Sequence, residues 1–452
     1  MTAETRGAPT PFAPAAAGTV TVYRGATVID GTGSAPRPAT TVVVDGERIV
    51  AVAPDAAAAV PVDAEVVDLA GHWLIPGLID SHQHVATPPN RPVAEAVLRR
   101  DLLGGVTATR DMADDLRQVA DLARASLVGE IAAPDLHYAA LMAGPSFFDD
   151  PRTWQVSQGV VPGSVPWMQA VAPDTDLPLA VALARGTFAT AIKVYANLPG
   201  ETVAAITAEA HRQGVPVWAH AAVFPATPSQ VIASGVDSVS HVTLLVHEAA
   251  RRELTSYRDK PPIDFDRFTG GDDPLMRALF QDMRRRGTIL DATASMWARI
   301  AADAQAEGDD DLHGLAVRNA DMAAALTAQA HREGVALATG TDSDPDPDAE
   351  WPPLHDELVF LAERCGIPVL DVLRSATLVG AQSIGAERDM GSVEPGKLAN
   401  LAVLAADPLT DLGAALRSIR LTVKRGHRHE RGAGVVGHAP VPVPAARKEA
   451  AV

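Results

Sequence analysis

The sequence predicts an α/β fold, a (β/α)8 TIM-like barrel joined to a small β-sandwich that both chain ends build. Between residues 78 and 388, short apolar runs alternate with longer Ala-rich stretches of helical spacing. This alternation is typical of βα units around a parallel sheet. Eight such runs occur, the number that a closed barrel needs. Residues 19–77 and 389–428 consist of short strand patterns between Gly and Pro turns, which predicts the second domain.

The eight candidate strands share an apolar centre, as expected for strands that are buried on both faces. They cover residues 74–85, 106–112, 135–143, 188–196, 215–221, 238–245, 287–293 and 335–343. The two ends of the chain differ from this pattern. Residues 1–18 and 429–452 are rich in Ala and Pro, which predicts a disordered N-terminal segment and a flexible C-terminal tail.

Composition excludes several classes of protein. The chain has 452 residues with 38 Lys and Arg against 56 Asp and Glu, a net charge of −18, so we expect no nucleic-acid partner. The single cysteine, Cys365, excludes an intrachain disulfide and a cysteine-only metal site. Neither a secretory signal pattern nor an apolar run long enough for a bilayer is visible. We therefore expect a cytoplasmic protein with no membrane partner.

The first barrel strand ends with His82 and His84. Residues two apart in a strand share one face, so both imidazoles can point at the same ion. Imidazole nitrogens are common ligands of zinc and related metals. The carboxyl end of a barrel strand is also where active sites form. This pair therefore predicts a metal site.

Lys193 lies in an otherwise apolar strand, where an unpaired ammonium group is costly to bury. A buried acidic partner would give it a structural role. The functional alternative uses the ready pKa shift of a buried lysine. A neutral amine can add carbon dioxide and become a carbamate, whose oxygens can bridge two cations. We favour the carbamate.

Three more strands end in candidate ligands, namely His220, His241 and Asp342. Taken singly, each histidine is more simply a packed core residue, and the aspartate a helix N-cap. Taken together with the other three, they place six candidate ligands on five strand ends. Capping and packing do not explain the whole set.

These residues and their motifs resemble the amidohydrolase superfamily, in its imidazolonepropionase-like and Xaa-Pro dipeptidase-like branch. The resemblance covers nearly the whole chain. The motifs are PGLIDSHQHV, GVTATRDM, IKVYANLP, ATGTDS, LHDELVFL and GSVEPGKLANLAVLAADP. The resemblance implies a metal-holding (β/α)8 barrel with a small β-sandwich. It also leaves a homo-oligomer open as the assembled state.

The resemblance also implies a role for each candidate ligand. His82 and His84 resemble the ligands of the more buried metal, and Lys193 the carbamate bridge. His220 and His241 resemble the ligands of the second metal. Asp342 resembles the catalytic residue that binds the first metal and shuttles a proton.

The implied cofactors are two divalent ions, zinc first, with manganese and cobalt also compatible with oxygen and nitrogen ligands. A carbamate derived from carbon dioxide on Lys193 completes the set. Two positions depart from the family pattern. Ser240 stands where relatives often have Glu, and Asn400 where Asp is usual. Neither departure removes a ligand.

We therefore expect a hydrolase that cleaves an amide or peptide C–N bond through a metal-bridging hydroxide, with a peptide-like or N-acyl amino acid substrate. A first rival function is an imidazolonepropionase-type hydrolase of cyclic amides or amidines, or a deaminase. Deaminases of the superfamily generally lack the lysine, so Lys193 counts against that version. A peptide-tailoring enzyme of a bottromycin-like pathway also stays open, as does a catalytically silent barrel that serves as a binding module.

Three residues are candidate substrate contacts: Tyr195, His355 in the LHDEL motif, and the weaker candidate His137. The segment after Asp342 carries six carboxylates within residues 344–357. It is either a solvated acidic loop or a device that attracts a cationic substrate group. Trp154 and Trp167 either wall a pocket or fasten their loop to the barrel.

Overall fold

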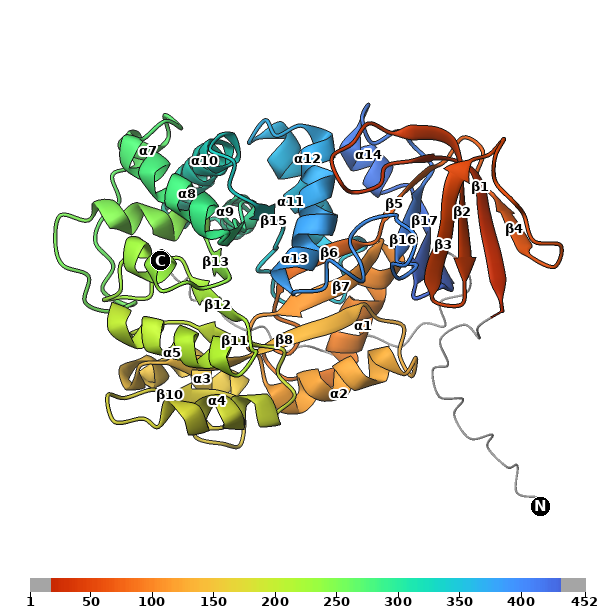
Figure 1. Ribbon diagram of the computed structural model, residues 1–452. Coiled ribbons are helices and arrows are strands. Elements are labelled where there is room, and N and C mark those ends of the chain that lie inside the picture. Colours follow the sequence, from red (N-terminus) through yellow and green to blue (C-terminus); the bar gives the residue numbers. More distant parts are fainter. Residues whose placement is uncertain (1–17, 432–452) are drawn as a thin grey trace, which may run out of the picture.

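The computed structural model describes residues 18–431, which form a barrel and a mixed β-sheet that lie side by side (Figure 1). The predicted disordered N-terminus and most of the predicted tail fall outside the described residues. The tail prediction overlaps the last strand, which runs to Glu430. The predicted domain boundaries at residues 77/78 and 388/389 stay predictions.

Eight parallel strands form the barrel, and each pairs with the next one along the chain. Their bounds are β6 Leu78–Gln83, β7 Val106–Asp111, β8 Asp135–Ala143, β11 Ala191–Val194, β12 Val217–His220, β13 Ser238–Ser240, β14 Ile289–Asp291 and β15 Leu337–Ala338. All eight predicted strands are present. Most of their residues are buried, as the apolar runs predict.

The last strand closes on the first through a few hydrogen bonds instead of a full ladder. The Ser81 amide donates to the Thr339 carbonyl at 2.7 Å, and the Asp342 amide donates to the His82 carbonyl at 2.9 Å. Gln83 and Ser343 form an isolated parallel bridge. These bonds bring the ends of β6 and β15 together, and with them two of the predicted ligand positions.

Helices follow the strands and cover the outside of the barrel (Figure 1). They are α1 Arg91–Leu103, α2 Leu116–Leu127, α3 Pro151–Val156, α4 Leu177–Gly186, α5 Gly200–Arg212, α6 Pro228–Ala233, α7 Phe265–Phe268, α8 Pro274–Arg286, α9 Met296–Glu307, α10 Asp310–Arg332, α11 Pro353–Glu363, α12 Val369–Arg374 and α13 Gly380–Ser383.

Side-chain caps fix where several of these helices begin. Asn90, Asp115, Asp176 and Asp273 each accept a hydrogen bond from a backbone amide in the first turn of the helix that follows. Such a bond satisfies an amide that has no partner inside the helix. Because each helix starts at a defined residue, the loop between strand and helix has a defined length at the carboxyl end of the barrel.

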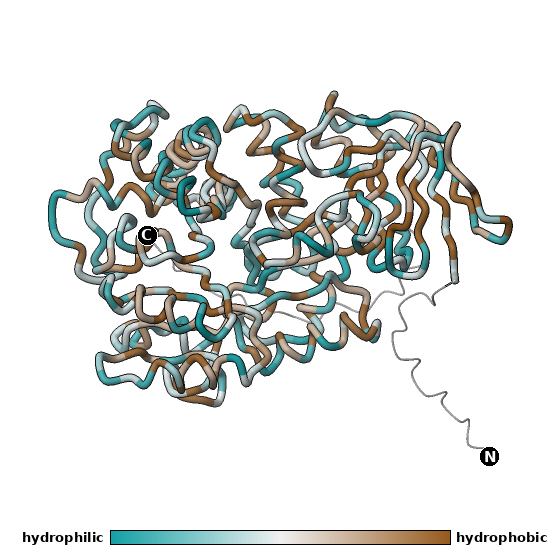
Figure 2. Tube along the Cα trace, in the orientation of Figure 1, coloured by the Kyte–Doolittle hydropathy of each residue, from teal (hydrophilic) through white to brown (hydrophobic). Residues whose placement is uncertain are grey.

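Strands from both chain ends form the second sheet, in the order β18-β17-β16-β5-β1-β2-β3, with β4 also on β1. The bounds are β1 Val20–Val28, β2 Arg37–Asp45, β3 Arg48–Pro54, β4 Glu65–Asp68, β5 Trp73–Pro76, β16 Leu401–Leu404, β17 Ile419–Lys424 and β18 His427–Glu430. Apolar stretches run along these strands (Figure 2). The prediction that both chain ends build one unit is confirmed.

The short helix α14 Leu412–Leu416 connects β16 to β17. A small hairpin consists of β9 Ser164–Val165 and β10 Met168–Ala170, and β10 pairs in parallel with the carboxyl end of β8. Within residues 18–431, no helix combines the length and the apolar character that a membrane crossing requires.

Candidate metal centre

The carboxyl ends of the barrel strands surround one cavity of about 270 Å³. All six predicted ligands line it, and they come from five strand ends, as parallel strands in a barrel dictate. They are His82, His84, Lys193, His220, His241 and Asp342.

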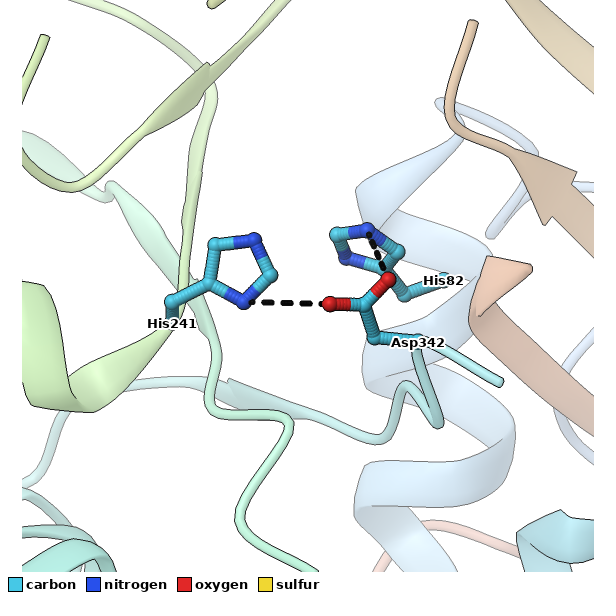
Figure 3. A group of neighbouring side chains, drawn as sticks. All are labelled: His82, His241 and Asp342. Carbon is cyan, nitrogen blue, oxygen red and sulfur yellow. Dashed lines mark ion pairs between the residues drawn. The ribbon is translucent and has the colours of Figure 1, made fainter. Parts of the chain in front are cut away.

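Three of these side chains form the tightest group. His82, His241 and Asp342 place one ligand atom each within 4.8 Å of one another. Figure 3 shows both imidazoles directed at the carboxylate of Asp342. The distance is 3.5 Å from His82 Nε2 to Asp342 Oδ1 and 3.7 Å from His241 Nδ1 to Asp342 Oδ2. His84 Nε2 lies 3.4 Å from the same Oδ1 atom. Asp342 is therefore the centre of the group.

Two buried carboxylates orient the first histidine pair from behind. Asp291 Oδ2 accepts a hydrogen bond from His82 Nδ1 at 2.7 Å, and Asp114 Oδ1 accepts one from His84 Nδ1 at 2.7 Å. Each bond fixes the ring and leaves Nε2 facing Asp342. Carboxylate partners of this kind are typical of metal-binding histidines, because they set the tautomer and make the free nitrogen more basic.

Lys193 is fully buried at the base of the cavity. Its ammonium group has one hydrogen bond, to Ser240 Oγ at 3.3 Å, and Ser240 in turn donates to Asp291 Oδ2 at 2.9 Å. Asp291 is also paired with Arg110 at 3.2 Å. Burial lowers the pKa of Lys193 to about 7. Within residues 18–431, the lysine therefore has no direct carboxylate partner, and Ser240 lies between it and Asp291.

His220 has no hydrogen-bond partner for its buried Nδ1 atom within the described residues. Its ring centroid lies 4.8 Å from that of His241 and 3.9 Å from that of Tyr195. A buried polar atom without a partner costs on the order of 1–3 kcal/mol. Such an atom beside the other ligand candidates indicates a site that is completed by something outside the chain.

The backbone is strained where the ligands emerge. His241 has a φ of 71°, Asp342 a φ of 47° and Thr293, at the end of β14, a φ of 44°. Left-handed conformations of residues other than glycine are uncommon and gather at functional sites. The Thr293 hydroxyl lies 3.0 Å from His241 Nδ1. Three neighbouring strand ends therefore turn sharply to aim side chains into the cavity.

The candidate ligands in the cavity differ in their pKa shifts and hence in their protonation states. Burial lowers the pKa of His241 to about 3, which keeps its imidazole neutral. Burial acts on Asp342 in the opposite direction, but the neighbouring His82, His84 and His241 outweigh it and hold the pKa of Asp342 well below its usual value. Neutral imidazoles and an ionised carboxylate are the protonation states that bind a metal.

The donor set fits a divalent cation. Four imidazoles and one carboxylate converge, two of the imidazoles have carboxylate partners behind them, and a third has an orphaned nitrogen. Oxygen and nitrogen ligands of this kind suit zinc and its first-row neighbours. His82, His241 and Asp342 form one candidate metal cluster, which is consistent with a divalent ion.

Aromatic and other apolar side chains form the rest of the cavity wall. Tyr195 stacks near Phe147 and Tyr257, with ring centroids 4.7 and 5.6 Å away. Further apolar lining residues are Met112, Leu141, Val156, Met168, Leu244, Met296 and Trp297. A cavity with polar groups at its base and an apolar wall is typical of a small-molecule site.

Of the predicted substrate contacts, the structure brings only Tyr195 to this cavity. His355 is buried on α11, and its Nε2 bonds to the Gly104 carbonyl at 2.8 Å. His137 is the third residue of β8, at the opposite end of the barrel from the cavity residue Leu141. Neither is among the lining residues. A role in substrate binding therefore stays a prediction for both histidines.

The six carboxylates of the acidic segment after Asp342 have different surroundings. Only Asp344 of its six carboxylates lines the cavity. Glu357 is buried and accepts hydrogen bonds from the Ala294 and Ser295 amides at 3.0 and 2.7 Å. Asp356 pairs with Arg417 on the surface. The attraction of a cationic substrate group by this segment therefore stays a prediction.

Neither Trp154 nor Trp167 is among the described residues that line the cavity. Trp154 is 54% exposed, and Trp167 is buried with the Arg117 guanidinium 5.7 Å from its ring. Trp167 therefore fastens its loop.

Sequence reasoning missed several residues of the site. Asp291 lies near the end of the predicted strand 287–293 and is the last residue of β14, so the rule that identified the other ligands also applied to it. Asp114 follows the second strand by three residues. Arg152 lines the cavity from α3, and Tyr257 and Lys260 line it from a long loop. No local pattern marks such positions.

The barrel and its strand-end ligands define a class, the metal-dependent hydrolases. The sequence matches the Amidohydrolase family over residues 73–428. The chain belongs to this family, and it is an enzyme that acts on carbon–nitrogen bonds with a candidate metal site. The resemblance inferred from the motifs is confirmed.

Solved structures show the same fold. A Xaa-Pro dipeptidase with bound methionine in its active site has a TM-score of 0.72 at 22% identity, over 91% of this chain and 100% of the other. Ochratoxinase of A. niger has a TM-score of 0.71 at 21% identity, over 92% and 97%. Molinate hydrolase has a TM-score of 0.70 at 18% identity, over 95% and 99%. No curated protein matches the sequence.

Proposed function

We propose that the protein hydrolyses an amide or peptide bond of a peptide-like or N-acyl amino acid substrate, with two divalent ions, zinc first, and a carbamate on Lys193. The observation that carries this proposal is the convergence of all six N- and O-donor candidates on one cavity, where His220 Nδ1 has no partner in the described chain. The likeness to a Xaa-Pro dipeptidase supports the substrate class. A cytoplasmic location is also part of the proposal.

In the proposed centre, His82 and His84 would hold the first ion with Asp342, and His220 and His241 would hold the second. When bound, such ions would supply Lewis acidity, which lowers the pKa of water and polarises a carbonyl. Lys193 is suited to the carbamate because burial lowers its pKa to about 7, so that a large fraction of the amine is neutral and nucleophilic.

Asp342 is the proposed proton carrier. Its carboxylate faces three imidazoles and is kept ionised by them, so it can accept the proton of the attacking water. It then delivers this proton to the departing nitrogen, which leaves as a neutral amine while the carbonyl carbon gains the oxygen. Asp291 and Asp114 keep His82 and His84 in place throughout.

The proposal is tested by metal analysis, a substrate screen and one variant. Protein supplied with Zn²⁺ or Mn²⁺ and bicarbonate should bind two ions per chain and cleave members of a dipeptide and N-acyl amino acid library. With ¹³C-bicarbonate it should show a carbamate NMR signal that Lys193→Ala lacks, and this variant should lose one ion and most activity. Less than one ion per chain and no hydrolysis would instead support a silent binding module.

A further inference from the structure

Two cationic side chains, Arg152 and Lys260, line the same cavity as the ligand candidates. Arg152 belongs to α3, in the loop region after β8, and Lys260 lies between β13 and α7. The proposed hydrolysis uses neither of them. Both lie in connections that follow barrel strands, and in this fold such connections determine which substrates bind.

Both cations have unused hydrogen-bonding capacity. The Lys260 ammonium group lies 4.2 Å from the Tyr257 ring and has no ion-pair partner within residues 18–431. Arg152 pairs with Asp150 through Nε and Nη2, the latter at 2.8 Å. Its Nη1 atom makes no hydrogen bond within the same residues. A partly buried ammonium and a free guanidinium edge are both suited to an incoming anion.

Specific contacts hold the two segments in position. The Tyr257 amide donates to Asn197 Oδ1 at 2.9 Å, which joins the Lys260 segment to the loop after β11. Arg258 lies 3.6 Å from Asp150, the carboxylate that also pairs with Arg152. Asp150 therefore links the two cationic segments. The positions of the segments do not depend on the Lys260 ammonium group or on the free edge of Arg152.

The acids of the cavity do not neutralise this pair. Asp114 is bound by His84, Thr87 and the Ala86 amide, and Asp342 lies among the histidines. Asp344 is the remaining lining carboxylate. No ion pair joins it to Arg152 or Lys260 in the described chain. Asp150 pairs with both Arg152 and Arg258, so one carboxylate offsets two guanidinium groups and a net positive charge remains for a ligand.

The position of the pair indicates the shape of that ligand. The Tyr257 ring contacts both Lys260 and, at 5.5 Å between centroids, His220. The ammonium therefore lies one ring away from a proposed metal ligand, with Tyr195 and Phe147 along the wall. A ligand that fits is short, apolar along one side and anionic at the end remote from the metal centre.

We propose that Arg152 and Lys260 form a carboxylate-binding subsite, so that the substrate carries a free carboxylate next to an apolar group. An N-acyl amino acid or a dipeptide with a free C-terminus has this chemistry. The proposal rests on the proposed function for the reaction, but the subsite itself is tested by binding alone. It also contrasts with the expectation that an acidic loop selects cationic substrates.

The test compares two uncleavable probes, 3-phenylpropanoate and 3-phenylpropan-1-ol, which differ only in the charged end. Titration calorimetry on the full chain, with and without added Zn²⁺, should give tighter binding of the carboxylate. Arg152→Met and Lys260→Met should each raise its Kd about tenfold, the effect of one charge-assisted hydrogen bond. Neither should change the Kd of the alcohol more than about twofold.

Arg251→Met is the matched control, since it removes an exposed cation of the same connection that does not line the cavity. It should leave both Kd values within about twofold of the wild-type values. Asp344→Asn should not weaken the binding of 3-phenylpropanoate. Equal binding of the two probes, or an unchanged carboxylate Kd in both cavity variants, would overturn the subsite. If the probes behave as expected but no substrate is cleaved, only the proposed hydrolysis fails.

Discussion

The two ends of the barrel differ in how their buried charged side chains are paired. At the end near the second sheet, Asp135 lies 2.9 Å from Lys424 Nζ and 2.9 Å from Arg425 Nε. Lys424 also donates to Ser126 Oγ and to the Ala133 carbonyl, at 2.7 and 2.8 Å. These buried charges therefore have their partners within the chain.

At the carboxyl end, three groups that line the cavity have missing or distant partners, although His82 and His84 are paired with carboxylates. Within residues 18–431, Lys193 has one hydrogen bond, at 3.3 Å, His220 Nδ1 has none, and Lys260 has no acidic ion-pair partner. Buried charges with partners in the chain are satisfied without a ligand, whereas unpaired ones cost stability and are kept where a ligand completes them. The contrast separates a structural end from a functional end, and it can be tested residue by residue.

The largest effect is expected when two single histidine variants, one at each end of the barrel, are compared. His220→Ala should lower kcat/KM on the best library substrate about 10³-fold, because loss of a metal ligand removes several kcal/mol of transition-state stabilisation. His137→Ala removes the same side chain from the other end of the barrel, and activity should stay within about twofold. Similar losses in both variants would remove the functional distinction between the two ends.

A stability measurement tests the opposite end. Lys424→Met keeps the aliphatic stem but leaves Asp135 with Arg425 alone, so the free energy of unfolding in urea should fall by about 3 kcal/mol. Metal content and kcat/KM of the folded protein should not change. If this variant lost metal without losing stability, the paired end would not be merely structural.

The smallest effect is a pH dependence at Lys260. Burial, and to a lesser extent Arg152, lowers the pKa of Lys260 to about 8. As the pH rises through this value the ammonium loses its charge, so the Kd of 3-phenylpropanoate should rise, about fivefold between pH 7 and about pH 9.5. Calorimetry should show a flat profile for Lys260→Met. A wild-type profile that is equally flat would show that Lys260 stays charged or takes no part.

The sequence by itself determined the barrel and the identities of the ligand candidates. Parallel strands bring their carboxyl ends to one face, so polar residues such as His82 and Asp342 had to meet there wherever the helices lay. The same local logic predicted Lys193, since an ammonium in an apolar strand needs a special reason. It could also have predicted Asp291.

Only the tertiary structure decided which loop residues line the cavity. His355 lies in a family motif and His137 in a barrel strand, yet their side chains face other parts of the molecule. Tyr257 and Lys260 reach the cavity through a long loop whose course depends on contacts such as the one with Asn197. Strand ends are fixed by short-range periodicity, whereas loop positions depend on packing between residues far apart in the sequence, which no local pattern encodes.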